Sequence, residues 1–295
     1  MEVPPIVATS QGGVTTLTLK PGNGCTTILT ERLWPWLESM VPEQASRPDC
    51  RGIVLRVPAS VRLIGPDLVT LISVTSTERR QRLDADRRAL TVLEQCPVPS
   101  IAVIEGEALA GGFEVALACD FRIAVRTATM KIGFPLVRAG LIPCWGGTQR
   151  SARLVGVEEA LDRLLSGECY EWNDPPPEDL VDSYVAPDEV AAAVDRLLAE
   201  GDWHEMRRVK RSPVSPDLLP TAEYLEEIRS RLSDWEPTLQ PTAAAIVRVV
   251  LEGALSDLHA GLEREAEAFL GILNSPLVPE QIDAFLRDAS NGWSE

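Results

Sequence analysis

Lysine and histidine are scarce in this chain, and positive charge is outnumbered. Lys and Arg together number 28 against 44 Asp and Glu, and the formal net charge at pH 7 is −16. The lysines are Lys20, Lys131 and Lys210. Sequence-independent binding to nucleic acid needs clustered basic side chains, and so does binding to an anionic membrane. The composition therefore argues against both kinds of partner.

Long apolar runs and closely spaced cysteines are also missing. No apolar stretch approaches the roughly 18 residues that span a bilayer. The first residues, MEVPPIVATS, lack the basic and apolar regions of a signal peptide. The six cysteines form no CxxC pair and have no histidine nearby, so they fit neither a zinc site nor a redox motif. We therefore expect a cytoplasmic protein with reduced thiols and no metal.

The first half of the chain alternates strand and helix patterns. Residues 14–19, 51–57 and 100–106 are β-branched and apolar, which predicts three strands. The polar segment 75–88 predicts an exposed helix with charge pairs at i,i+4. FRIAV, after the apolar helix that follows Gly112, predicts a further strand. Strand–helix units of about 40 residues favour an α/β spiral in which successive turns stack.

An early helix is expected to begin with Thr27 as its N-cap. Leu29, Leu33 and Leu37 follow at helical spacing, and Pro35 should kink that helix or end it early.

From about residue 157 the chain becomes mostly helical. Residues 173–187 and 212–220 are rich in proline and are expected to be loops. We expect a core of residues 1–200 and a helical region of residues 201–295 that closes the subunit or packs on a neighbour.

Three segments carry candidate chemistry: LIGPDL at 63–68, EGEALAGGFEVALACD at 105–120, and GFPLVRAGLIPCWGGTQR at 133–150. A glycine pair at a helix start leaves main-chain N–H groups without partners and without side-chain cover. The positive end of the helix dipole points the same way. One such N–H, with another from the LIGPDL turn, would form a cradle for an anion. A helix-packing role for the glycine pair is the alternative.

In this order and spacing, the segments resemble the crotonase, or enoyl-CoA hydratase/isomerase, family over about residues 10–200. The resemblance implies a spiral of ββα turns with a helical C-terminal region, and a homotrimer or a dimer of trimers. It implies an acyl-CoA or acyl-carrier thioester as substrate, with no cofactor besides the coenzyme A of the substrate itself. Two main-chain amides would hold the thioester oxygen, and by the same resemblance they belong to Ile64 and Gly111.

The resemblance also assigns side chains. Glu114 matches the first of the two carboxylates that a hydratase of the family uses, and Asp67 and Leu68 match the family's turn except that Pro66 interrupts it. The second carboxylate should follow Pro135, and Leu136 stands there instead. Residues expected to contact the substrate are Arg62, Gly65, Asp67, Leu68, Pro135, Leu136 and Trp145.

The leucine makes a two-carboxylate hydration doubtful, because leucine can neither transfer a proton nor orient water. Hydration or dehydration, isomerisation and decarboxylation with one carboxylate remain open, and the family's decarboxylases resemble this arrangement. A crotonase-fold binding or assembly subunit without catalysis is the alternative. The arginines of the exposed helix are further candidates, as contacts for nucleotide phosphates: Arg79, Arg80, Arg82, Arg87 and Arg88.

Overall fold

The computed structural model describes residues 5–20, 27–29 and 32–290. Its contacts divide the chain into two compact units, each built from separated segments. The first unit comprises residues 1–66, 84–133 and 169–210, and the second comprises residues 67–83, 134–168 and 211–295. The division into a core of residues 1–200 and a helical region of residues 201–295 stays a prediction.

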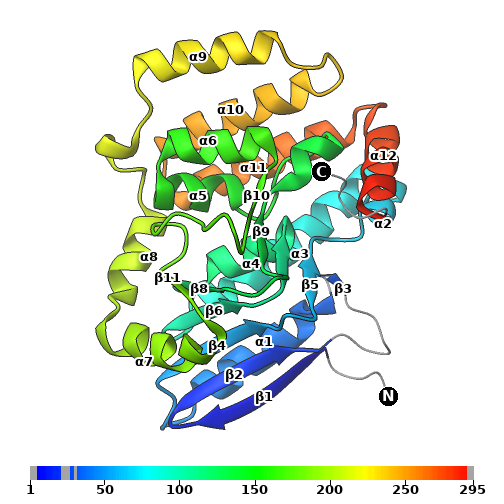
Figure 1. The fold of residues 1–295 in the computed structure, drawn as a ribbon. Helices are drawn as coiled ribbons and strands as arrows, with labels where there is room; N and C mark the ends of the chain where they lie inside the picture. Colours follow the sequence, from blue (N-terminus) through cyan, green and yellow to red (C-terminus); the bar gives the residue numbers. More distant parts are fainter. Residues whose placement is uncertain (1–4, 21–26, 30–31, 291–295) are drawn as a thin grey trace. The chain divides into compact units, whose positions relative to one another are not determined.

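Two sheets form the frame of the first unit (Figure 1). The larger runs in the order β1-β2-β4-β6-β8-β11 and is parallel except for the β1–β2 hairpin. Its strands are β1 (Ile6–Gln11), β2 (Val14–Leu19), β4 (Gly52–Val57), β6 (Ser100–Ile104), β8 (Phe121–Val125) and β11 (Ser183–Val185). Every residue of β6 and β8 is buried, as expected for central strands of a parallel sheet covered on both faces.

The smaller sheet runs in the order β10-β9-β7-β5-β3. Its strands are β10 (Cys169–Glu171), β9 (Lys131–Gly133), β7 (Glu107–Leu109), β5 (Arg62–Ile64) and β3 (Thr27–Leu29). The pairs β4/β5, β6/β7 and β8/β9 each place one strand in each sheet, so the expected spiral of ββα turns is confirmed. The turns are unequal in length, because α3 (Ser76–Glu94) is much longer than α4 (Gly111–Ala118).

The other helices of the first unit are α1 (Trp34–Ala45), α7 (Val190–Glu200) and α8 (Trp203–Arg211), whose last residue belongs to the second unit. Side chains of α7 pack with strand residues such as Val54, Ile101 and Ile123 in one apolar cluster. Burial of these apolar side chains is the main force that holds the helix to the sheet.

Two sequence-based expectations are wrong. Thr27 begins strand β3 and caps no helix, because its segment pairs in parallel with β5. Helix α1 starts at Trp34, so Pro35 lies in its first turn, where a missing N–H costs no hydrogen bond. Within the expected loop at 173–187, residues Ser183–Val185 form β11, which extends the larger sheet beside β8.

The second unit is helical. It contains α2 (Leu68–Ser73), the first residues of α3, η2 (Pro135–Ala139), α5 (Gly147–Val155), α6 (Val157–Ser166), α9 (Ala222–Ser233), α10 (Gln240–Ala254), α11 (Leu258–Leu273) and α12 (Val278–Ser290). The apolar faces of α5, α6, α10 and α11 pack together. Across the described residues, no helix is both long enough and apolar enough to cross a membrane.

Candidate functional site

The start of α4 presents main-chain N–H groups that the protein does not use itself. Glycines occupy its first two positions, and neither Gly111 N nor Gly112 N donates to another group within the described part of the chain. The next two amides, of Phe113 and Glu114, both donate to Ala110 O at 3.0 Å. Gly111 is buried, so these N–H groups face little solvent and retain most of their electrostatic strength.

The backbone at Ala110, immediately before the glycine pair, is strained. Its φ of 51° and ψ of −121° are unusual for a residue with a side chain, and no other described residue except glycine has a positive φ. The conformation is held by the surroundings, since Ala110 N donates to Gly133 O at 2.9 Å. Such strain costs on the order of 1–3 kcal/mol and concentrates at functional sites. No pattern in the sequence indicated this strain.

The end of β5 and the turn after it lie directly against α4. A Cβ on Gly112 would come within 2.1 Å of Leu63 O, so only glycine permits this approach. A Cβ on Gly65 would lie 3.4 Å from Gly111 N, in ordinary van der Waals contact. The structure therefore brings Ile64, Gly65 and Gly111, all expected at the site, into one small region of the first unit.

Glu114 follows one turn into the same helix. Its side chain is 1% exposed, and it is one of the few carboxylates so deeply buried among the described residues. Residues three apart in a helix lie on the same side, which places Glu114 on the side of α4 that carries Gly111. A buried carboxylate beside unpaired N–H groups is an arrangement suited to proton transfer near a bound anion.

Arg62 lies at the opposite end of β5 and pairs within the sheet. Its Nε donates to Glu107 Oε2 at 2.8 Å, and the register places Arg62 opposite Glu107 and Glu107 opposite Lys131. Lys131 Nζ in turn lies 2.6 Å from Glu171 Oε1, across from it on β10. These four residues form a charge row across four strands. The substrate contact expected of Arg62 would have to compete with this ion pair.

Glu105, another acidic residue of the 105–120 segment, also has an arginine partner. Arg56 Nε and Nη2 donate to its Oε1 at 3.1 and 2.5 Å. The Glu105 and Glu107 carboxylates are thus both engaged in ion pairs.

In the second unit, Asp67 caps α2. Its Oδ1 accepts from the amides of Val69 and Thr70, and its Oδ2 accepts from Thr70 Oγ1 at 2.6 Å. The hydroxyl of Thr70 is the main cause that lowers the pKa of this carboxyl below its usual value. Leu68 is the first residue of α2. Asp67 therefore has a clear structural role, independent of any contact with substrate.

Pro135 and Leu136 open the short helix η2, where both are buried. Arg138 is exposed and packs over Gly167, whose Cβ would lie 3.3 Å from the Arg138 Nε and Cγ atoms. The Arg138 side chain is thus exposed, whereas Leu136 is buried.

Trp145 is buried in the second unit, just before the glycine pair Gly146-Gly147 at the start of α5. Here the helix start is filled by the protein itself. Glu265 of α11 accepts from Gly146 N at 2.5 Å, from Thr148 N at 2.9 Å and from the Thr148 hydroxyl. Arg150 donates to the Trp145 carbonyl oxygen. Complete burial raises the pKa of Glu265, while these hydrogen bonds favour its charged form.

Two arginines of α3 that were candidates for phosphate contacts are engaged with the protein. Arg79 donates to the main-chain oxygens of Leu71, Ile72 and Leu273, and to Asn274 Oδ1. Arg80 donates to Glu263 at 2.9 Å. Arg79 thus joins the ends of α2 and α11, a structural role that the charge pattern alone did not indicate.

Comparison with known proteins assigns the chain to a family. Residues 28–207 match the model of the enoyl-CoA hydratase/isomerase family. The chain is 32% identical over 213 residues to the fatty acid oxidation complex subunit alpha of Vibrio cholerae, and 28% identical over 247 residues to that of Idiomarina loihiensis. These alignments cover 70% and 81% of the chain but only 30% and 34% of the relatives. The chain thus spans about a third of their length.

Solved structures share the fold. A carnitinyl-CoA dehydratase from Mycobacterium thermoresistibile superposes with a TM-score of 0.69 at 20% identity, covering 96% of this chain and 89% of that one. An enoyl-CoA hydratase from Bacillus halodurans gives 0.66 at 20% identity, with 95% and 99% covered. At these identities the likeness establishes the crotonase fold. Together with the match over residues 28–207, it shows that the chain belongs to the enoyl-CoA hydratase/isomerase, or crotonase, family.

Proposed function

We propose that this chain is an acyl-CoA enzyme that stabilises the enolate of a thioester at the start of α4. The observation that carries the proposal is the pair of unused, buried N–H groups of Gly111 and Gly112 with Glu114 one turn away. An enolate oxygen would accept from Gly111 N, and the positive end of the α4 dipole would favour its charge. Removing one donor of this kind typically costs 100- to 1,000-fold in rate.

In this proposal Glu114 moves the proton at the carbon next to the thioester carbonyl. The family's hydratases use a second carboxylate, and Leu136 stands at that position. A one-carboxylate reaction therefore suits the chain better than hydration of a double bond. Isomerisation needs one group that removes and returns a proton, whereas decarboxylation forms the enolate by loss of carbon dioxide and needs little more than the N–H groups.

A panel of acyl-CoA substrates tests the proposal. The chain would be incubated with crotonyl-CoA, with a 3-enoyl-CoA and with methylmalonyl-CoA, and the products would be separated by mass. Isomerised 2-enoyl-CoA or released carbon dioxide supports a one-carboxylate enzyme. Rapid hydration of crotonyl-CoA would show that Leu136 does not prevent two-group chemistry. Failure to bind any acyl-CoA would overturn the proposal.

Replacing Glu114 with glutamine tests the proton-transfer role. The change keeps the size of the side chain and one acceptor oxygen but removes the proton acceptor, so turnover should fall by about 100- to 10,000-fold. The matched control is Glu189→Gln, because Glu189 is an exposed carboxylate of the same unit paired with Arg126. Unchanged turnover in Glu114→Gln would remove this residue from the mechanism.

The second hydrogen-bond donor is proposed to be Ile64, and Pro66 sharpens the test of that assignment. Proline has no N–H, so residues 64–66 offer only the amides of Ile64 and Gly65. Pro66→Ala adds a third amide to the turn. If Ile64 is the second donor, turnover changes by less than about threefold. A rise of about tenfold or more would place the donor at position 66 and show that the native chain works with fewer hydrogen bonds.

A non-catalytic binding subunit is the second candidate, and Leu136 is the observation that favours it. Such a subunit would bind acyl-CoA without converting any member of the panel. An acyl-carrier thioester is an alternative form of the substrate, distinguished by comparing the same acyl group on both carriers. Sedimentation would test the proposed homotrimer or dimer of trimers, as three or six times the 32.2 kDa subunit.

A further inference from the structure

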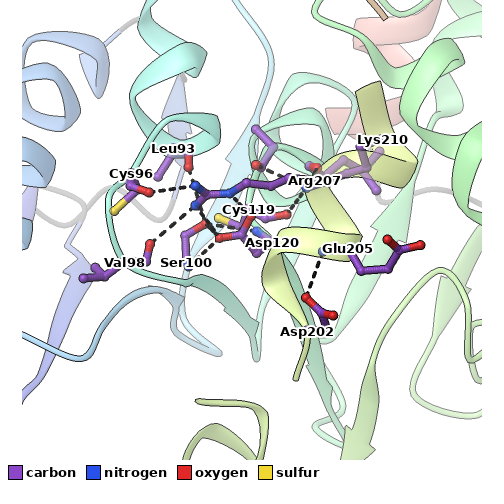
Figure 2. Close-up of polar contacts among 12 residues, drawn as sticks. Leu93, Cys96, Val98, Ser100, Cys119, Asp120, Asp202, Glu205, Arg207 and Lys210 are labelled. Atoms are coloured by element: carbon purple, nitrogen blue, oxygen red, sulfur yellow. Dashed lines mark hydrogen bonds and ion pairs between the residues drawn. The ribbon is translucent and has the colours of Figure 1, made fainter. Parts of the chain in front are cut away.

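The C-terminal end of α4 is held by a buried lysine from a distant part of the chain. Lys210 Nζ donates to the main-chain oxygens of Leu117, Ala118 and Cys119 at 3.2, 3.5 and 2.5 Å (Figure 2). The lysine is 4% exposed. Helix-terminal carbonyls lack partners within the helix, and a cation there also opposes the negative end of the dipole. Lys210 therefore fixes the end of α4 that lies opposite the candidate site.

The helix that carries Lys210 is itself locked in place. Arg207, one turn earlier on α8, donates from Nε and Nη2 to the two oxygens of Asp120 at 2.6 and 2.7 Å. Asp120 is fully buried and also accepts from the amide and hydroxyl of Ser100 at 2.8 and 3.0 Å. Figure 2 shows Arg207 reaching the carbonyl oxygens of Cys96 and Val98 as well. Its guanidinium lies 4.4 Å from the Trp203 ring.

The two ends of α4 are therefore set by different contacts. At the start, Gly112 lies so close to Leu63 O that α4 cannot move nearer to β5. At the far end, Lys210 holds three carbonyls, and α4 is only eight residues long in all. A short helix moves as a rigid rod, so a shift at one end displaces the amides at the other.

We propose that Lys210 is a positioning residue for the reaction: its ammonium group fixes α4 so that Gly111 N points at the substrate oxygen. This inference rests on the function proposed above for the start of α4. It adds that the hydrogen bond from Gly111 N to the substrate oxygen depends on the charge of Lys210 at the opposite end of α4. Small errors in donor placement reduce rates strongly while leaving most of the binding contacts unchanged.

The experiment measures how strongly the site polarises a bound carbonyl. The probe is a cinnamoyl-CoA, whose absorption moves to longer wavelength when hydrogen bonds draw electrons toward its thioester oxygen. The variants are Lys210→Met and Lys210→Arg. The matched control is Arg208→Met, because Arg208 is an exposed cation of the same helix paired with Glu205. The absorption shift is measured at saturation, so that it reports on bound probe in folded protein.

For Lys210→Met we expect at least half of the shift to be lost, with kcat lowered about 10- to 100-fold and KM changed by less than about threefold. Lys210→Arg keeps the charge and should restore a large part of both. Arg208→Met should match the native protein. If Lys210→Met does not fold, Lys210→Gln takes its place, since it keeps a hydrogen-bond donor and loses the charge.

The outcomes separate this inference from the proposed function. A native protein that binds the probe without any shift overturns the proposed function, and this inference with it. If folded Lys210→Met or Lys210→Gln shows the full absorption shift of the native protein, the inference about Lys210 is overturned and the proposed function stands. A fall in thermal stability with an unchanged shift and an unchanged kcat would likewise show that Lys210 only holds the fold together.

Discussion

A glycine pair begins a helix twice in this chain, and the two helix starts are treated in opposite ways. At α5, the buried carboxylate of Glu265 accepts hydrogen bonds from Gly146 N and Thr148 N. At α4, Gly111 N and Gly112 N donate to no group in the described part of the chain. A glycine pair therefore accompanies one helix start whose N–H donors are filled by the protein and one whose donors are not, each within its own unit of the fold.

A glycine pair at a helix start is therefore not enough to define a site. Glycine allows another group to approach the N–H groups, but the rest of the fold decides whether that group belongs to the protein or to a ligand. Buried N–H groups without partners are rare in native proteins, because each costs about 1–3 kcal/mol. The structure retains that cost at α4, and it adds strain at Ala110, in the segment where the family resemblance placed the chemistry.

The largest expected effect is a loss of stability when the Glu265 carboxylate at the start of α5 is removed. Glu265→Ala leaves the donors of Gly146 and Thr148 unsatisfied in a buried place, and it should lower the free energy of unfolding by about 4 kcal/mol. Glu265→Gln keeps one acceptor oxygen and should cost about half as much. Urea denaturation measures both, with the exposed Glu267→Ala of the same helix as control. A loss below about 1 kcal/mol for Glu265→Ala would show that filling this helix start matters little.

The next largest effect, on both stability and turnover, is expected when a side chain is added at the start of α4. Gly112→Ala places a Cβ 2.1 Å from Leu63 O and forces α4 away from β5. The free energy of unfolding should fall by about 2–3 kcal/mol, and turnover should fall at least about 100-fold. Gly271→Ala is the matched control, since its Cβ meets no atom within 4 Å and should raise stability by about 0.5–1 kcal/mol. A Gly112→Ala enzyme with native turnover would contradict the assignment of this helix start to the site.

The smallest expected effect concerns α2, where the Asp67 side chain caps the first N–H groups of the helix. Asp67→Ala removes the acceptor for Val69 N and Thr70 N and should cost about 1 kcal/mol at neutral pH. The native pKa of Asp67 is lowered, so its contribution is complete above the usual value of 3.8 and disappears as the pH falls through the lower native pKa. Unfolding curves of both proteins should therefore converge at strongly acidic pH. A difference independent of pH would mean that the carboxylate charge is not the cause.

Much of the frame could be predicted from local sequence. Val14–Leu19 and Phe121–Val125 alternate or bury apolar residues as strands require, and both form strands. The prediction that Thr27 caps a helix was wrong, because a short polar-to-apolar segment fits a helix cap and a strand equally well. Pairing with β5 decides between them. The glycine pair of α4 was located correctly, since glycine at a helix start has a local physical signature.

The contacts that hold α4 and α5 were not predictable, because they join residues far apart in sequence. Glu265 lies 117 residues from Thr148, and Lys210 lies 91 residues from Cys119. Nothing in the sequence around Lys210 distinguishes it from an exposed lysine of a charged helix. The ion pair of the fully buried Asp120 with Arg207 was not indicated by the sequence either, although Asp120 stands inside the 105–120 segment. The roles of the individual site residues stay predictions until the variants are measured.

The charge row of the smaller sheet has a consequence for how its strands find their neighbours. Arg62, Glu107, Lys131 and Glu171 alternate in sign across four adjacent strands. If two neighbouring strands exchanged places, like charges would face each other, and such pairs are destabilising. We therefore expect the row to disfavour a misordered sheet, and concentrated salt should weaken that effect by screening these partly exposed pairs.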